Sequence, residues 1–171
     1  MSRIILAALT VALAVYSYVE IRIGLPLLTA RIPTHSGSTA PVGEVLSTGL
    51  YITWFLQLFL AVLLLGAPYV AADKIHLGSW RLGRYTPEQQ DRILPSLREL
   101  TGLRALLLSF YFSSRIYLEI REASSHGPFL PVDWLRSVDR TECELLAALA
   151  VVCGIIIYLY VAKFDELADQ D

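Results

Sequence analysis

The sequence predicts an all-α membrane protein with four transmembrane helices and one amphipathic helix on the cytoplasmic side. Two observations predict this fold class. Of the 171 residues, 55% are hydrophobic and only 18% are charged, whereas soluble domains average about 25% charged residues. The apolar residues also gather in four long stretches, and a helix needs about 20 mainly apolar residues to cross a bilayer. We therefore expect a single membrane domain over residues 1–171, with spans at about 4–23, 50–72, 101–120 and 145–162.

The first stretch has an uncharged part of 16 residues, from Ile4 to Val19. The preceding Arg3 and the tripeptide Ala12-Leu13-Ala14 resemble parts of a cleavable signal peptide. In a signal peptide, such a tripeptide follows the apolar region and marks the cleavage site. Here the tripeptide lies inside the apolar run. We therefore expect this stretch to remain as the first span.

The second stretch has 23 residues without a formal charge, and the fourth has 18. Both are long enough to cross a bilayer as helices. The third stretch is less apolar because it contains Arg104 and Arg115. Its segment from Ala105 to Phe112 is rich in Leu and aromatic residues, and an even number of spans agrees with the charge distribution. We therefore expect the third stretch to be a span as well.

Basic residues favour an orientation with both ends of the chain in the cytoplasm. Cytoplasmic segments of membrane proteins carry more Lys and Arg than outer segments do. With the N-terminus inside, the cytoplasmic segments carry seven such residues. The outer loops, 24–49 and 121–144, carry four, and Arg22 at the outer end of the first span makes five on the outer side. Tyr and Trp near the ends of the spans fit the aromatic belts at the two membrane surfaces.

The cytoplasmic loop, residues 73–100, contains the start signal of a helix. Thr86 can cap that helix, and Gln89 can complete a capping box with it. The residues Ile93, Leu97 and Leu100 then fall on one helical face, so we expect this helix to lie on the membrane surface. We expect Pro95 to bend the helix.

The tail, residues 163–171, is acidic. Its last seven positions contain four acidic residues, and such runs of like charge are usually solvated. We therefore expect the tail to be a solvated end.

Two short motifs after the first stretch carry a family resemblance. Leu25-Pro26 and then Ile32-Pro33-Thr34-His35 resemble the signature of a bacterial membrane domain of unknown function. That domain is found at the N-terminus of SdpI-type immunity proteins and in small four-span proteins. Ser36 and Ala40 stand where the family usually has Phe and Gly. The resemblance implies a location in the bacterial cytoplasmic membrane.

Pro33, Thr34 and His35 form the candidate functional loop. His35 can serve as a proton-sensitive or ligand-binding imidazole. Its ring can also do no more than hydrogen-bond to the loop backbone. We favour the second interpretation, because no other type of metal-ligating side chain clusters nearby.

Arg115 is the candidate centre of an intramembrane ion pair. A cation within a span is costly unless it is paired, and such residues are functional candidates by default. Glu119 is one turn further along the same helix and can pair with Arg115. Glu20, at the outer end of the first span, is an alternative partner. The arginine can also extend its head group to the outer interface.

Ala147, Ala150 and Gly154 form a candidate packing face on the fourth span. Small residues let two helix backbones approach closely within a membrane. The sequence leaves open whether the neighbouring helix is internal or belongs to a partner protein.

The remaining signals argue against several functions. A net charge of -2 excludes the basic surface that nucleic-acid binding requires. The sequence contains no catalytic motif, and its three histidines all lie in predicted loops, so we expect neither an enzyme nor a cofactor or metal site. The favoured function is an accessory or stabilising subunit that docks onto other membrane protein subunits. The alternative, implied by the resemblance, is an immunity or signalling regulator that senses an extracellular peptide.

Overall fold

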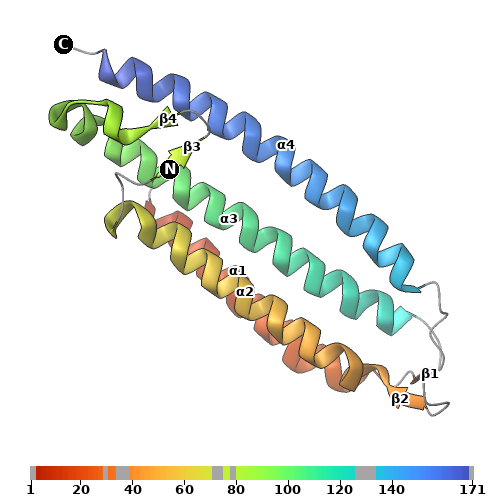
Figure 1. Ribbon diagram of the computed structural model, residues 1–171. Helices are drawn as coiled ribbons and strands as arrows, with labels where there is room; N and C mark the ends of the chain where they lie inside the picture. The colour runs from red at the N-terminus through yellow and green to blue at the C-terminus, as the bar shows by residue number, and fades with distance from the viewer. Residues whose placement is uncertain are drawn as a thin grey trace.

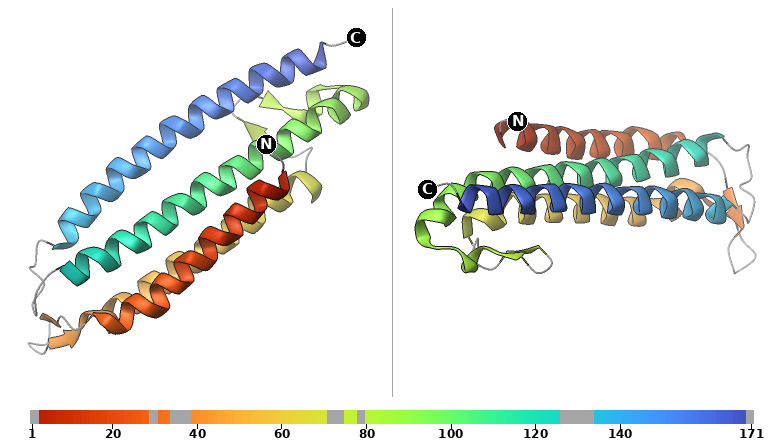
Figure 2. Two further views of the ribbon diagram at one scale, coloured as in Figure 1. Left: turned by 180° about the vertical axis from the view of Figure 1, so that it is seen from behind. Right: turned by 90° about the horizontal axis from the view of Figure 1, so that it is seen from above.

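Four long helices run side by side in the computed structural model, which describes residues 3–28, 31–33, 39–70, 75–77, 80–125 and 134–169 (Figure 1). The beginning of α1 and the end of α4 lie at the same end of the bundle, and both views in Figure 2 show this arrangement. The expectation of a helical fold is therefore confirmed. The helices are α1 (Arg3–Leu27), α2 (Val42–Val70), α3 (Pro87–Ser125) and α4 (Trp134–Ala168).

Three of these helices are long and apolar enough to cross a membrane. The qualifying segments are Arg3–Leu27, Leu46–Val70 and Cys143–Ala168. Many of their large apolar side chains, such as Phe55, Val62 and Ile155, point away from the rest of the protein. Water would disfavour such a surface, whereas lipid would not. The chain thus has the helices of an integral membrane protein.

The predicted third span, residues 101–120, lies within α3 at the centre of the bundle. α3 packs against α1, α2 and α4, whereas α4 packs mainly on α3. Because other helices cover much of α3, its inward faces can carry polar side chains that lipid would disfavour. This position explains why α3 is not among the three segments that qualify by length and composition.

The predicted cytoplasmic helix is not a separate element. α3 begins at Pro87 and continues through Pro95 to Ser125. Its start matches the predicted capping box: the Thr86 backbone N–H donates to Gln89 Oε1 at 3.0 Å, and the Gln89 N–H donates to Thr86 Oγ1 at 3.4 Å. Pro95 lies on an exposed side of the helix, where water can solvate the carbonyl that loses its donor.

The prediction that Ile93, Leu97 and Leu100 rest on the membrane surface was wrong. All three are fully buried in an apolar cluster, together with Trp80 and Phe164. The cluster joins the first turns of α3 to the last turns of α4. An amphipathic pattern shows only that one face is apolar, and here that face meets protein instead of lipid.

The predicted solvated tail is also largely helical. α4 continues to Ala168, and both Phe164 and Ala168 are buried. Gln89 Nε2 donates to the Ala168 carbonyl at 2.9 Å, so the start of α3 binds the end of α4. The acidic residues of the described part of the tail, Asp165, Glu166 and Asp169, are exposed.

Two short hairpins replace parts of the predicted loops. Strands β1 (Arg31–Pro33) and β2 (Thr39–Pro41) pair antiparallel between α1 and α2. Strands β3 (His76–Leu77) and β4 (Trp80–Arg81) pair antiparallel before the 3₁₀ turn η2 (Leu82–Arg84). Figure 1 shows the two hairpins at opposite ends of the bundle.

Trp80 and Tyr85 connect the β3–β4 hairpin to α4. Trp80 Nε1 donates to the Tyr85 hydroxyl at 2.9 Å, and that hydroxyl donates to Asp165 Oδ1. The Trp80 and Phe164 rings lie 4.8 Å apart. Burial raises the pKa of Tyr85, and its hydrogen bond to Asp165 raises that pKa further. Tyr85 therefore remains a protonated donor at neutral pH, and the link would weaken only at pH values above the usual tyrosine range.

A stripe of buried residues on α1 faces α3. The stripe consists of Leu6, Thr10, Ala14, Ser17, Ile21 and Gly24. Its small members let the two helices approach closely. A methyl group added at Gly24 would lie 2.6 Å from Ile120 Cγ2, and one at Gly102 would lie 3.2 Å from Leu6 Cδ1. The close approach therefore extends over most of the length of α1.

We expect Gly24→Ala to destabilise the bundle by about 1–3 kcal/mol, because the new methyl group would overlap Ile120. The matched control is Gly66→Ala in α2, where an added methyl group meets nothing within 4 Å. The control should be neutral or slightly stabilising, since Ala favours helix over Gly. Thermal unfolding in mild detergent measures both variants. Equal stability of the two would contradict close packing at Gly24.

Candidate functional site

Four polar residues meet near the middle of the bundle, and we call them the polar node. They are Ser17 of α1, Gln57 of α2, and Ser109 and Ser113 of α3, and all four are buried. In an apolar interior each polar group needs a hydrogen-bond partner, because no water replaces one that is lost. The node is therefore the part of the described interior where side-chain chemistry is concentrated.

Ser113 is the centre of the polar node. Its Oγ lies 2.8 Å from Ser17 Oγ, 3.2 Å from the Leu13 carbonyl and 2.8 Å from the Ser109 carbonyl. It also accepts a hydrogen bond from Gln57 Nε2 at 3.1 Å. A hydroxyl has one proton to donate, so Ser113 shares it among the acceptors while it accepts from Gln57. One side chain thus connects three helices.

Gln57 ties α2 to α3 through both protons of its amide nitrogen. Nε2 donates to the Ser109 carbonyl at 3.2 Å as well as to Ser113 Oγ. Gln57 Oε1 and Ser109 Oγ are buried and have no hydrogen-bond partner among the described residues. Each such atom costs about 1–3 kcal/mol. The net stabilisation by the node is therefore small, and its main effect is to select which helix faces meet.

The sequence analysis missed the polar node. Its members are uncharged and divided among three predicted spans, so none stands out in the hydropathy pattern. The available signal was weaker: Ser, Thr and Gln within predicted spans join helices by hydrogen bonds. Ser109 and Ser113 are also spaced by four residues and so share one face of α3.

Trp54 adds a second link between α1 and α2 beside the node. Its Nε1 donates to the Ala14 carbonyl at 2.9 Å. Its ring lies 5.2 Å from the ring of Tyr18. The Ala14 carbonyl already belongs to the hydrogen-bond ladder of α1, and carbonyl oxygens can accept twice. α1 is therefore fixed to both α2 and α3 at this level.

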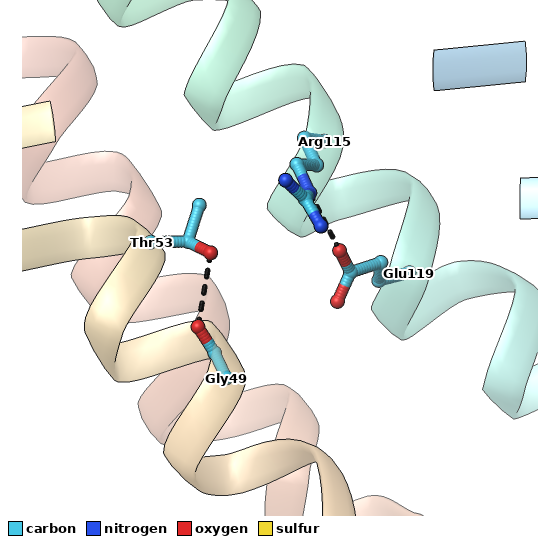
Figure 3. Close-up of polar contacts among 4 residues, drawn as sticks. All are labelled: Gly49, Thr53, Arg115 and Glu119. Carbon is cyan, nitrogen blue, oxygen red and sulfur yellow. Dashed lines mark hydrogen bonds and ion pairs between the residues drawn. The ribbon is translucent and has the colours of Figure 1, made fainter. Parts of the chain in front are cut away.

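Arg115 and Glu119 form an ion pair on α3. Arg115 Nε lies 2.9 Å from Glu119 Oε1, and the side chains are 35% and 12% exposed, so the pair lies at the side of the bundle and not in its core. Figure 3 shows the pair beside α2, where Thr53 Oγ1 donates to the Gly49 carbonyl at 2.9 Å. Within lipid such a pair lowers the cost of an isolated cation.

Glu20, the alternative partner of Arg115, lies in a different place. It lines a crevice with Tyr117 and Arg121 of α3. Each residue of a helix is rotated by about 100° from the one before, so Tyr117 and Arg121 lie on the other side of α3 from Arg115 and Glu119. The structure brings Glu119 to Arg115 and places Glu20 apart from them.

The remaining candidate residues that the structure describes lie at one end and on the exposed side of the bundle. Pro33 is in β1, whereas Thr34 and His35 lie outside the described residues. Ala147, Ala150 and Gly154 are exposed on α4. A methyl group added at Gly154 would meet nothing within 4 Å. All three small residues are therefore accessible on the outer side of α4.

Comparison of the chain with protein-family models, with curated proteins and with solved structures finds no match. The resemblance of the segment 25–35 to the membrane domain of SdpI-type proteins therefore stays a prediction from the sequence.

We expect Ser113→Ala to destabilise the bundle by about 1 kcal/mol, because it removes the hydroxyl shared by α1, α2 and α3. In a double-mutant cycle, Ser17→Ala should cost less in the Ser113→Ala background than alone. Ser47→Ala is the matched control, because Ser47 Oγ bonds only within its own helix, to the Glu44 carbonyl. Chemical unfolding in detergent micelles gives the energies. Fully additive losses for Ser17 and Ser113 would show that the two hydroxyls do not interact.

Proposed function

We propose that the protein is a non-enzymatic accessory subunit with four transmembrane helices, which stabilises a larger membrane protein complex by docking α4 against a partner helix. Three apolar helices support the membrane location. The absence of catalytic motifs from the sequence supports a structural role. The small-residue face of α4 is the observation that carries the proposal.

α3 is the fourth span in this proposal. It runs alongside α1 and α2 over their length (Figure 1), and it is longer than either of them. Ser109 and Ser113 are buried in the node, and Arg115 is joined to Glu119 in an ion pair. Both arrangements remove polar groups from lipid. The first turns of α3, from Pro87 onward, would then extend beyond the membrane on the cytoplasmic side.

Among the three candidate spans, the segment in α4 is the one least covered by other parts of the protein. No residue from Cys143 to Lys163 is buried, and α4 packs mainly on α3. Its last turns, in contrast, are held by the apolar cluster around Phe164 and Trp80. α4 is therefore firmly anchored at one end, while Ala147, Ala150 and Gly154 remain accessible along the span. Such a face permits close backbone contact with another helix but offers little surface to lipid.

The proposed orientation places both ends of the chain in the cytoplasm. Glu44 and Glu88 are both exposed and both lie in the first turn of a helix, α2 and α3 respectively. In a variant without Cys143 and Cys153, a membrane-impermeant thiol reagent applied to intact cells should label Glu44→Cys and spare Glu88→Cys. The opposite pattern would reverse the orientation. Labelling of both positions would show that α2, which lies between them, does not cross the membrane.

We expect Gly154→Leu to release the protein from its complex while the protein itself stays folded and membrane-inserted. The larger side chain would separate the two helix backbones, whereas a methyl group added at Gly154 meets nothing within 4 Å among the described residues of this chain. Gly66→Leu is the control, because Gly66 is also a helical glycine with open space around it. Purification in mild detergent, followed by identification of co-purifying proteins, gives the result.

Two results would contradict the proposed role. If Gly154→Leu remains fully assembled, the face is ordinary lipid-exposed surface. If the native protein co-purifies only with a secreted peptide or a transcriptional repressor, the immunity role implied by the family resemblance is correct instead.

A further inference from the structure

A crevice of about 260 Å³ lies between α1 and α3, close to the ends of both helices. Glu20 is seven residues before the last residue of α1, and Arg121 is four before the last residue of α3. At 1.5 Å per residue these positions lie about 10 Å and 6 Å from the helix ends. In a membrane this is the level of the interface, where Tyr is also enriched. Tyr117 lines the crevice at this level.

The floor of the crevice is apolar and fixed by close packing. Gly24 and Ile120 meet there, because a methyl group at Gly24 would lie only 2.6 Å from Ile120. Ile23 and Leu27 extend the apolar lining toward the helix end, and both are exposed. This floor can contact a hydrocarbon chain without exposing it to water.

The rim of the crevice carries one acid and one base. Arg121 Nη1 donates to the Tyr117 hydroxyl at 3.3 Å, and its guanidinium carbon lies 5.8 Å from the centre of the Tyr117 ring. These contacts hold the guanidinium over the crevice and leave most of its five donors for other acceptors. Glu20 presents a carboxylate on the α1 side. The rim thus offers a positive group and a negative group above one apolar floor.

We propose that this crevice binds one phospholipid with a phosphoethanolamine head group. Arg121 binds the phosphate, for which a planar guanidinium is well suited. Glu20 accepts hydrogen bonds from the primary ammonium group. An acyl chain lies along Ile23, Leu27 and Ile120. The inference does not depend on the accessory role, since it concerns the side of the bundle formed by α1 and α3.

Charge complementarity selects this head group over its rivals. A phosphoglycerol head group has a net negative charge and leaves Glu20 facing no cation. A phosphocholine head group has a cation, but its methyl groups cannot donate hydrogen bonds to Glu20. Inorganic phosphate has neither an ammonium group nor a chain for the apolar floor. Of these candidates, only the phosphoethanolamine lipid satisfies the acid, the base and the floor together.

The test is lipid binding by the purified, delipidated full-length protein, followed by native mass spectrometry. The probes are phosphatidylethanolamine, phosphatidylcholine and phosphatidylglycerol with identical acyl chains. We expect phosphatidylethanolamine to bind about tenfold more tightly than phosphatidylcholine, as one hydrogen bond to a charged group provides. Glu20→Gln should abolish this preference. Arg121→Gln should weaken both zwitterionic lipids about equally, because both carry the phosphate.

Arg22→Gln is the matched control, because Arg22 is an exposed cation on the same turn of α1 that does not line the crevice. It should leave phosphatidylethanolamine binding unchanged, and circular dichroism should show all three variants to be folded. An equal loss in Arg22→Gln would overturn the proposal, because it would indicate general surface charge. Equal affinity for phosphatidylglycerol, displacement of the lipid by inorganic phosphate, or the absence of saturable binding would overturn it as well.

Discussion

The close approach of α1 to α3 is the contact on which the rest of the bundle depends. It is made at three levels: Leu6 against Gly102, Ser17 against Ser113, and Gly24 against Ile120. Each level needs a small residue on one of the two helices, because a larger one would separate the backbones. With α1 held this close, Ser113 can reach both α1 and Gln57 of α2. The position of α2 therefore follows from the packing of α1 on α3.

The position of α4 follows from a different interaction, outside the predicted spans. The cluster of Ile93, Leu97, Trp80 and Phe164 joins the ends of α3 and α4 by apolar burial. Such burial is strong only where water is present, because lipid tails are as apolar as the side chains. We therefore expect the protein to use the hydrophobic effect at the end of the bundle where Asp165 and Glu166 are exposed, and small residues with hydrogen bonds inside the bundle. The weak covering of α4 within the span agrees with this division.

The positions of the helices could be predicted from the sequence, but which of their faces pack against protein could not. The physics of the membrane explains this difference. Hydropathy reports that a segment such as 50–72 is apolar, and apolar length decides whether a helix can cross a bilayer. It does not report whether a given side faces lipid or protein, because both environments are apolar. Ile93 and Leu97 were therefore assigned to the membrane surface, although they face Phe164. The capping box at Thr86 was predictable because it is a local interaction between residues close in sequence.

Small residues on a helix likewise do not show by themselves whether their face meets lipid or protein. The small-residue faces of α1 and α4 differ in both chemistry and exposure. The face on α1, with Ala14, Ser17 and Gly24, includes the Ser17 hydroxyl, which hydrogen-bonds across the contact, and it is buried. The face on α4, with Ala147, Ala150 and Gly154, has no hydroxyl group and is exposed. A hydroxyl inside a bilayer is stable only where a partner group is fixed, and a contact within one chain fixes its partner permanently. A face without polar groups has no such requirement, so it can remain open to lipid until a partner helix arrives. This difference in chemistry is what would be expected if α1 serves the folding of this chain and α4 serves its assembly.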